Sequence, residues 1–314
     1  MSNQVIIEKD GGRVRNVLGN VPRMFRYFTA SPETKVRSFY EMLDRRLTSK
    51  SDYRDIMGIK QLYVNMGYWE PGCADHDEAS EKLAEQLGAA AGISAGDRVL
   101  DVGFGYGEQD LFWLQTRNPA QIVGLNVSPS QVRVARDRAA ELKLEDRLDM
   151  RVGSGTSLPF QDASFDVVVA LESAVHFDTR QRFFEEALRV LRPGGVLATA
   201  DMLPNPARRG RRSVLERLDD WRRSQIIPDA NWHSRAVYAE RLALAGFADV
   251  DVRDITDRVL LPQAEFVRGR CTQALSRTEF NSAKNRRGMN LFIKLSDLRA
   301  ASREYVIAVA RKPR

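Results

Sequence analysis

The chain has 314 residues, of which 43% are hydrophobic and 29% charged, which is ordinary for a globular protein with a sizeable core. No apolar run is long enough to span a bilayer, and the first residues lack the basic and apolar stretches of a signal peptide, so we expect a cytoplasmic location and no membrane contact. Cys73 and Cys271 are the two cysteines and form no CxxC pattern, which argues against a disulfide framework or a zinc site. The formal net charge is +6, but the basic residues are interleaved with acidic ones along the chain, so we expect no nucleic-acid partner.

The N-terminal part differs from the rest of the chain. Residues 1 to about 70 are predicted to be mostly helical, with an amphipathic stretch over 34–47. We therefore predict a helical N-terminal cap over 1–75 and a core domain over 76–314. The N-terminal helices are the candidate interface of a homo-oligomer.

Short apolar runs alternate with amphipathic stretches from about residue 96 to 200, which is typical of βαβ units and a parallel sheet. Two more strands are predicted nearer the C-terminus, so the fold class is α/β with a doubly wound, mostly parallel sheet. The predicted strands cover 98–102, 121–125, 148–152, 165–171, 195–200, 249–254 and 305–310.

Several helix boundaries can be read from capping residues. Ser128 followed by Pro129 predicts the start of a helix that runs to about residue 142. Asp178 is the predicted cap of a helix that continues to residue 191. A further helix is predicted over 239–245, before Gly246.

Two segments interrupt the alternation, at about 203–231 and 261–302, and we predict that both form a lid over the open end of the sheet. The first segment contains a dense group of arginines: Arg208, Arg209, Arg211, Arg212, Arg217, Arg222 and Arg223. One interpretation is a solvated helix face opposite an inward apolar face of Val214, Leu215, Leu218 and Trp221. The alternative is a diphosphate site, because guanidinium groups bind phosphate oxygens in pairs.

A glycine-rich turn follows the first predicted strand. Gly103, Gly105 and Gly107 stand at the carboxyl end of that strand, where a parallel sheet binds ligands. A dinucleotide fingerprint needs a glycine at position 108, which is Glu108. Asp101 suits the ammonium group of an amino-acid moiety; the alternative is that it only ties down the loop.

The next strand ends also carry polar residues. Asn126 ends the second strand, where an acidic residue normally binds the ribose hydroxyls of a nucleoside, and Gln131 lies one turn into the next helix. After the third strand, Ser154, Gly155 and Thr156 form a tight turn where an adenine edge would lie.

These motifs together resemble the class I S-adenosylmethionine-dependent methyltransferases over about residues 62–312. The resemblance rests on DVGFGYG at 101–107, GLNVSPSQ at 124–131, LPFQDASFDVVV at 158–169 and RPGGVL at 192–197. YVNMGYWEPGC at 63–73 and LESAVH at 171–176 resemble the natural-product branch, and most of all the macrolide sugar O-methyltransferases of the erythromycin type.

The resemblance implies a Rossmann-like fold of seven strands, S-adenosylmethionine as cofactor and a small-molecule substrate. Tyr68 and Trp69 would lie over the cofactor, with Tyr106 beside the sulfonium. Two residues depart from the pattern, since Asn126 replaces the usual acid and Ser154 replaces a common aspartate. The implied cofactor-binding residues are Tyr68, Asp101, Gly103, Gly105, Gly107, Asn126, Val127, Gln131, Ser154, Gly155, Thr156, Leu171 and Glu172.

Methyl transfer to a hydroxyl requires a base near the ends of the fourth and fifth strands. His176 directly follows the fourth strand and can take a proton near neutral pH, and Asp201 at the end of the fifth strand could hold its ring in one tautomer. The resemblance points to the same pair. The alternative is that His176 only packs or caps.

Glu172 supports a second reading, because a glutamate at this place serves C-methylation in enzymes that act on isoprenoid or prenyl diphosphates. In that reading the arginine cluster holds the diphosphate. A third reading is a cofactor-binding homologue without transfer, such as a cyclase or scaffold. We expect no metal, because the carboxylates do not cluster as a divalent-ion site requires.

Overall fold

The computed structural model describes residues 30–47, 52–207, 213–277 and 282–314. The chain divides into two compact units, 1–31 and Pro32–Arg314, and the description below concerns the second. Of the segment predicted to be mostly helical, 1–29 and 48–51 lie outside the described residues. The boundary at residue 75 between a cap and a core stays a prediction.

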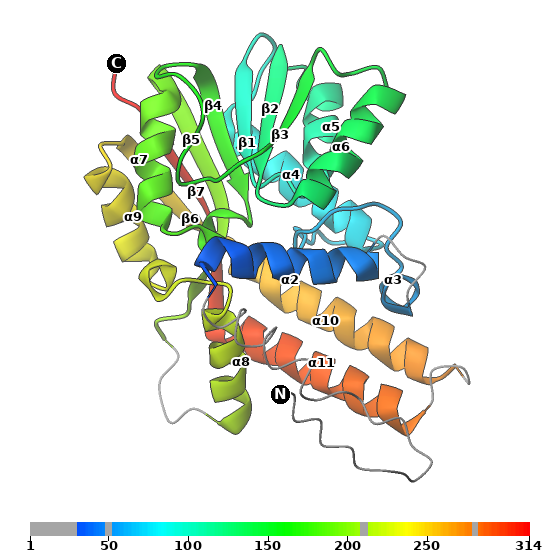
Figure 1. Cartoon of the computed structure of the whole chain (residues 1–314). Helices are drawn as coiled ribbons and strands as arrows, with labels where there is room; N and C mark the ends of the chain where they lie inside the picture. Colours follow the sequence, from blue (N-terminus) through cyan, green and yellow to red (C-terminus); the bar gives the residue numbers. More distant parts are fainter. Residues whose placement is uncertain (1–29, 48–51, 208–212, 278–281) are drawn as a thin grey trace, which may run out of the picture. The chain divides into compact units, whose positions relative to one another are not determined.

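A seven-stranded sheet forms the centre of this unit, with the order β3-β2-β1-β4-β5-β7-β6 (Figure 1). β1 to β5 pair in parallel, and β7 runs antiparallel to both β5 and β6. The predicted fold class, a Rossmann-like and mostly parallel sheet, is confirmed. The strands are β1 (Arg98–Val102), β2 (Gln121–Asn126), β3 (Leu148–Val152), β4 (Phe165–Leu171), β5 (Leu191–Pro204), β6 (Ala248–Asp254) and β7 (Arg303–Arg311).

Helices cover both faces of the sheet. One face packs against α4 (His76–Ala91), α5 (Glu108–Thr116) and α6 (Pro129–Glu141), and the other against α7 (Arg180–Val190) and α9 (Arg235–Leu244). Successive residues of β1 enter different clusters, because strand side chains alternate between faces: Val99 joins the first and Leu100 the second. Burial on both faces explains the nearly continuous apolar runs of the central strands.

The predicted start of α6 is confirmed, since the Ser128 hydroxyl accepts a hydrogen bond from the Gln131 N–H at 3.5 Å. The cap predicted for the next long helix was wrong by one residue. Thr179 caps α7 in place of Asp178, accepting from the Arg182 N–H at 3.4 Å. β5 runs from residue 191 to 204, well beyond its predicted end, because its residues 196–204 pair with β7. α9 also begins earlier than predicted, at residue 235.

The additional helices gather at the carboxyl ends of the parallel strands. α2 (Pro32–Leu47) crosses below the sheet in Figure 1, and α10 (Thr256–Leu275) packs beside α11 (Ala283–Ser302) beneath it. α3 (Asp52–Met57) lies against α10, and α8 (Val214–Ser224) against α11. Among the described residues, none of the helices combines the length and apolar character that crossing a membrane requires.

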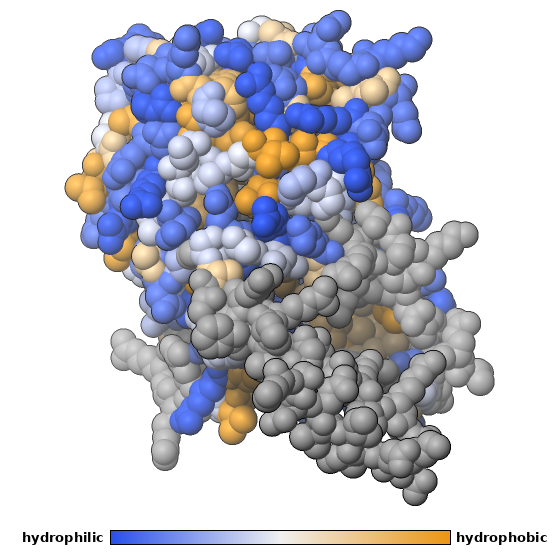
Figure 2. Space-filling view, in the orientation of Figure 1, coloured by the Kyte–Doolittle hydropathy of each residue, from blue (hydrophilic) through white to orange (hydrophobic). Residues whose placement is uncertain are grey.

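The inward apolar face predicted for α8 was wrong. Val214 is 84% exposed and Trp221 is 52% exposed, and Figure 2 shows apolar atoms at the lower end of this helix. Asp219 is buried instead, where it accepts hydrogen bonds from Arg299 and Arg303. Two charge-assisted bonds to distant arginines therefore set which side of α8 faces the protein.

Candidate active site

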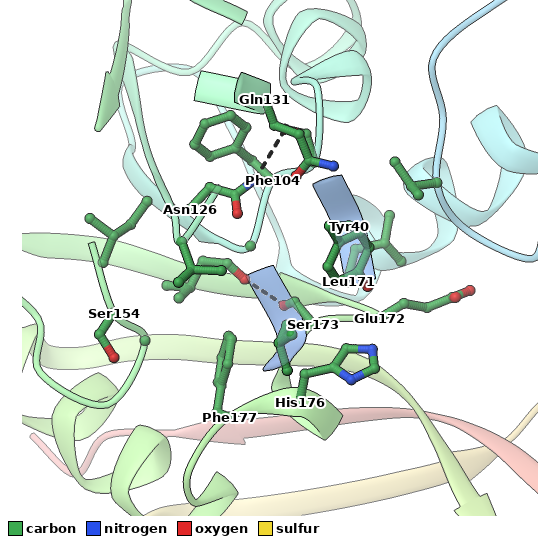
Figure 3. A pocket seen from close by; sticks show the side chains of 18 of the residues that line it. Tyr40, Phe104, Asn126, Gln131, Ser154, Leu171, Glu172, Ser173, His176 and Phe177 are labelled. Carbon is green, nitrogen blue, oxygen red and sulfur yellow. Dashed lines mark hydrogen bonds between the residues drawn. The ribbon is translucent and has the colours of Figure 1, made fainter. Parts of the chain in front are cut away.

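A cavity lies where β1, β2 and β4 end, the usual ligand position in a doubly wound sheet. The empty space in it is about 840 Å³, part of which is open solvent. In Figure 3, Asn126 and Ser154 lie on one side of the cavity and Tyr40, Glu172 and His176 on the other.

The glycine loop forms one wall, and its glycines are needed for steric reasons. Gly103 has φ +89°, and a Cβ placed there would come within 2.2 Å of the Ser173 Cβ. A Cβ on Gly105, at φ +59°, would lie 3.0 Å from Val64. Gly107 does not line the cavity but begins α5 in the left-handed conformation. The loop therefore brings bare backbone to the cavity at positions 103 and 105.

Asp101 lies behind this loop and outside the cavity lining. It is fully buried, and its carboxylate accepts a hydrogen bond from the Gln109 amide at 2.9 Å, which also donates to the Phe104 carbonyl at 3.0 Å. Burial raises the pKa of Asp101 to about 7, and burial together with the neighbouring Asp101 raises the pKa of Asp110 well above its usual range. The position of Asp101 behind the loop and its bond to Gln109 favour the interpretation that Asp101 ties the loop down.

Asn126 connects the end of β2 to the glycine loop. Its amide nitrogen donates to the Gly105 carbonyl at 3.1 Å and to the Gln131 side-chain oxygen at 2.9 Å, and its oxygen accepts from the Ser128 N–H (Figure 3). A carboxylate has no donor for either bond. Asparagine in place of the usual acidic residue therefore allows Asn126 to donate both of these hydrogen bonds.

The turn after β3 lines the same side of the cavity. The Ser154 hydroxyl accepts a hydrogen bond from the Thr156 N–H at 3.3 Å, which keeps the turn closed. A Cβ on Gly155 would meet the Phe177 ring at 2.8 Å, so the ring lies directly against the backbone. The cavity thus has a flat aromatic surface beside a polar turn. Val127 and Leu171 also line it.

His176 ends a short 3₁₀ turn, η2 (Ala174–His176), and reaches the opposite side of the cavity. Its Nδ1 lies 2.9 Å from the Ile226 carbonyl oxygen. Because a carbonyl only accepts hydrogen bonds, this contact assigns the ring proton to Nδ1 and leaves a lone pair on Nε2. Burial lowers the pKa of His176, a bond to Ile226 opposes that shift, and the charge of Arg180 lowers it further. The ring is therefore neutral at pH 7.

The predicted contact between Asp201 and the His176 ring was wrong. Asp201 is fully buried and accepts from the Val175 N–H at 3.1 Å and the Tyr238 hydroxyl at 2.8 Å, while Arg180 lies 3.2 Å away. The carboxylate therefore points beneath η2 and holds its backbone. The Ile226 carbonyl takes the role that the sequence assigned to Asp201.

Glu172 lies next to the cavity in a left-handed conformation, with φ +52°. One carboxylate oxygen accepts from the Met66 N–H at 2.7 Å and the Tyr305 hydroxyl at 2.8 Å. Burial raises the pKa of Glu172 to about 7. The two hydrogen bonds oppose this shift, and the charge of Asp201 adds to it. Its carboxyl group therefore changes charge near neutral pH.

Tyr40 is a cavity residue that the sequence analysis missed. It comes from α2, and its ring meets His176 edge to face at a centroid distance of 5.8 Å. Burial, followed by the charge of Glu172, raises the pKa of its hydroxyl. The available signal was the amphipathic pattern of 34–47, which predicts a helix but not the surface that the helix covers.

Three aromatic residues expected near the cofactor do not line this cavity. Tyr68 borders a separate polar groove, and Trp69 packs against Phe266 at 4.8 Å between ring centroids. Tyr106 is buried in an apolar cluster that also contains Met57.

The arginine cluster also lies away from the cavity where it can be followed. Arg208, Arg209, Arg211 and Arg212 lie outside the described residues. Arg217 and Arg222 are exposed, and Arg223 binds Asp229 at 3.1 Å and stacks on Trp232. Within the described ranges, neither arginine nor lysine lines the cavity, and no group of three or more metal-binding side chains occurs.

Comparisons with known proteins agree with this arrangement. A family model described as a methyltransferase domain matches residues 100–199. The chain is 41% identical to erythromycin 3''-O-methyltransferase from Saccharopolyspora erythraea, over 90% of this chain and 91% of the relative. This chain belongs to the S-adenosylmethionine-dependent methyltransferases. The predicted cofactor, S-adenosylmethionine, and the predicted class, an O-methyltransferase, are confirmed.

Two further relatives of this methyltransferase are informative. The 27-O-demethylrifamycin SV methyltransferase from Amycolatopsis mediterranei is 33% identical over 80% of this chain and 90% of the relative. The solved structure of the [4+2]-cyclase SpnF is 26% identical, with a TM-score of 0.68 over 88% of this chain and 95% of that chain. The same fold thus occurs in a protein that is named as a cyclase.

Proposed function

We propose that this methyltransferase methylates a hydroxyl group of a natural product, a macrolide or another glycosylated polyketide, with His176 as the general base. The observation that carries the proposal is the hydrogen bond between His176 Nδ1 and the Ile226 carbonyl, because it leaves the Nε2 lone pair for the acceptor proton. The erythromycin and rifamycin named in the relatives support the substrate class.

S-adenosylmethionine supplies a methyl group on a sulfonium that is ready for displacement. The bare backbone at Gly103 and Gly105 fits the close approach of such a cofactor, and the turn at Ser154 presents polar groups for its adenine. Asp101 and Gly107 support the loop from behind. The proposed contact residues are Gly103, Gly105, Asn126, Val127, Gln131, Ser154, Gly155, Thr156, Leu171 and Glu172, all of which line the cavity.

The acceptor side has a clear task, which is to hold a hydroxyl about 3 Å from the methyl carbon and to remove its proton. A neutral His176 is suited to the second task at pH 7, because its pKa is lowered by burial. The Tyr40 ring meets His176 at right angles, with an interplanar angle of 88°, and so limits the directions from which an acceptor can approach.

C-methylation of an isoprenoid or prenyl diphosphate through Glu172 is the second candidate. The burial of this carboxyl group beside the cavity favours it. A diphosphate, however, needs several cationic or N–H donors. The described cavity lining holds the acidic Glu33 and Asp178 but no arginine or lysine, so we prefer the hydroxyl acceptor. The third candidate, a homologue that binds the cofactor without transferring its methyl group, is disfavoured by the 41% identity to a named O-methyltransferase.

The test is to incubate the enzyme with S-adenosylmethionine carrying a deuterated methyl group and a macrolide whose 3''-hydroxyl is free. We expect an O-methylated product, and His176→Ala should lower its rate by about two to four orders of magnitude. His76→Ala is the matched control, because His76 is half-buried outside the cavity. A His176→Ala enzyme with the wild-type rate would refute the base assignment. A methyl group on carbon, or a product without the label, would favour the second or third candidate.

The cytoplasmic location, the absence of a nucleic-acid partner, the absence of a metal and a homo-oligomer through the N-terminal helices stay predictions.

A further inference from the structure

The insertion after β5 reaches the segment that carries His176. Asn231 ends the short 3₁₀ turn η3 (Asp229–Asn231) and is fully buried. Its amide nitrogen donates to the Val175 carbonyl at 3.0 Å and to the Phe177 carbonyl at 2.7 Å. One side chain therefore holds the backbone on both sides of the histidine.

The same Asn231 also holds the start of α7. Its side-chain oxygen accepts from the backbone N–H of Arg180 at 2.7 Å, and its backbone oxygen accepts from the Arg180 guanidinium at 2.8 Å. Arg180 in turn lies 3.2 Å from Asp201, which binds the Val175 N–H. The Val175 peptide is thus held at its N–H by Asp201 and at its carbonyl by Asn231.

Ile226 belongs to the same insertion and provides the carbonyl that faces His176 Nδ1 at 2.9 Å. Its neighbour Ile227 is 4% exposed and donates its N–H to the Arg223 carbonyl at 2.8 Å, so this stretch is packed and hydrogen-bonded in place. Backbone fixation from Asn231 and ring orientation from Ile226 therefore come from one segment, 226–231.

We propose that the segment 226–231 positions His176: Ile226 sets the ring tautomer, and Asn231 is the positioning residue that fixes the backbone of the turn. This inference rests on the proposed role of His176 as general base. The insertion is then more than a cover for the acceptor, because it completes the geometry of the base. Asn231 itself lies outside the cavity lining and has no direct contact to offer a substrate.

The first test needs no variant. The described chain contains the three histidines of the sequence, His76, His176 and His233, so ¹⁵N-histidine labelling gives a readable spectrum of ring nitrogens. We expect His176 in the wild-type enzyme to carry its proton on Nδ1. A proton on Nε2 would overturn the proposal, because Nδ1 would then have no hydrogen to donate to the Ile226 carbonyl.

The second test uses two variants of Asn231. Asn231→Ala removes all side-chain bonds, and Asn231→Asp keeps the shape and the acceptor for Arg180 but loses the two donated bonds. We expect kcat for the macrolide acceptor to fall about 10- to 100-fold, as a displacement of roughly 1 Å would cause, with KM and cofactor affinity unchanged within about twofold. The His176 ring signals should shift towards a mixture of tautomers.

Trp113→Phe is the control for general destabilisation. Its indole N–H donates to the Ala84 carbonyl at 2.9 Å between buried helices far from η2 in the sequence, so this variant should lower Tm without changing kcat or the His176 signals. Wild-type kcat and His176 signals in a folded Asn231 variant would overturn the proposal. Should both variants fail to fold, the wild-type tautomer still decides. A full rate in His176→Ala would instead refute the base itself.

Discussion

Gly103→Ala is the most informative perturbation of the cofactor loop. The native φ of +89° places any side chain in the left-handed region, which costs about 1–2 kcal/mol. The new Cβ would also stand 2.2 Å from the Ser173 Cβ, where ordinary contacts begin near 3.4 Å. Rotation of the Ser173 side chain cannot relieve this contact, because the Cβ is fixed by the backbone, and the Ser173 hydroxyl also donates to the Val102 carbonyl. The loop must therefore move by about 1 Å, and the backbone contacts to the cofactor that this disturbs should cost about 2–3 kcal/mol of binding, or roughly 100-fold in affinity.

Gly96→Ala is the matched control, because Gly96 has nearly the same φ, +92°, with no atom within 4 Å of the added Cβ. Isothermal titration with S-adenosylmethionine should give a Kd about 100-fold higher for Gly103→Ala and an unchanged Kd for Gly96→Ala. Both variants should lose a similar 1–2 kcal/mol or so from backbone strain. Wild-type affinity in a folded Gly103→Ala enzyme would refute the steric argument.

Three further predictions concern charge and burial. Asp219→Ala should lower the free energy of unfolding in urea by about 3–5 kcal/mol, because Arg303 is left buried and unpaired; a loss below 1 kcal/mol or so would contradict this. Burial raises the pKa of Glu172 from 4.5 to about 7, so the folded state binds this proton more tightly than the unfolded state does, and the stability of the protein falls as pH rises through that window. The free energy of unfolding of Glu172→Gln should therefore gain about 3 kcal/mol relative to wild type between pH 4.5 and 8. A difference in stability between the two proteins that stays constant with pH would be evidence against this. The acidic limb of the kcat profile should lie below pH 6.5, because burial lowers the pKa of His176; a limb above pH 7 would exclude this histidine.

The central sheet could be predicted from the sequence because each strand shows itself in a short, local pattern of residues. Strands buried on both faces read as apolar runs, and β1, β3 and β4 have the predicted bounds. The glycine loop was equally readable, since positive φ values and close approaches require glycine at 103 and 105. The start of α6 was also readable, because the capping residue Ser128 and Pro129 are neighbours in the sequence.

The site depends on contacts between distant segments, which local patterns do not encode. The acceptor for His176 is the Ile226 carbonyl, and a backbone group has no sequence signature. Asp201 stands beside the histidine in the sheet order, but Val175 and Arg180 attract its carboxylate beneath the turn. The orientation of α8 was missed for a similar reason, because the arginines that bind its buried acid lie about 80 residues further along the chain.

The role of His176 as general base is tested most directly by a crystal structure of the enzyme with S-adenosylhomocysteine and a macrolide that it methylates. We expect Nε2 of His176 to lie about 3 Å from the oxygen that receives the methyl group, while Nδ1 keeps its bond to the Ile226 carbonyl. An acceptor oxygen beyond hydrogen-bond reach of His176, with another side chain in contact with it, would show that His176 is not the base.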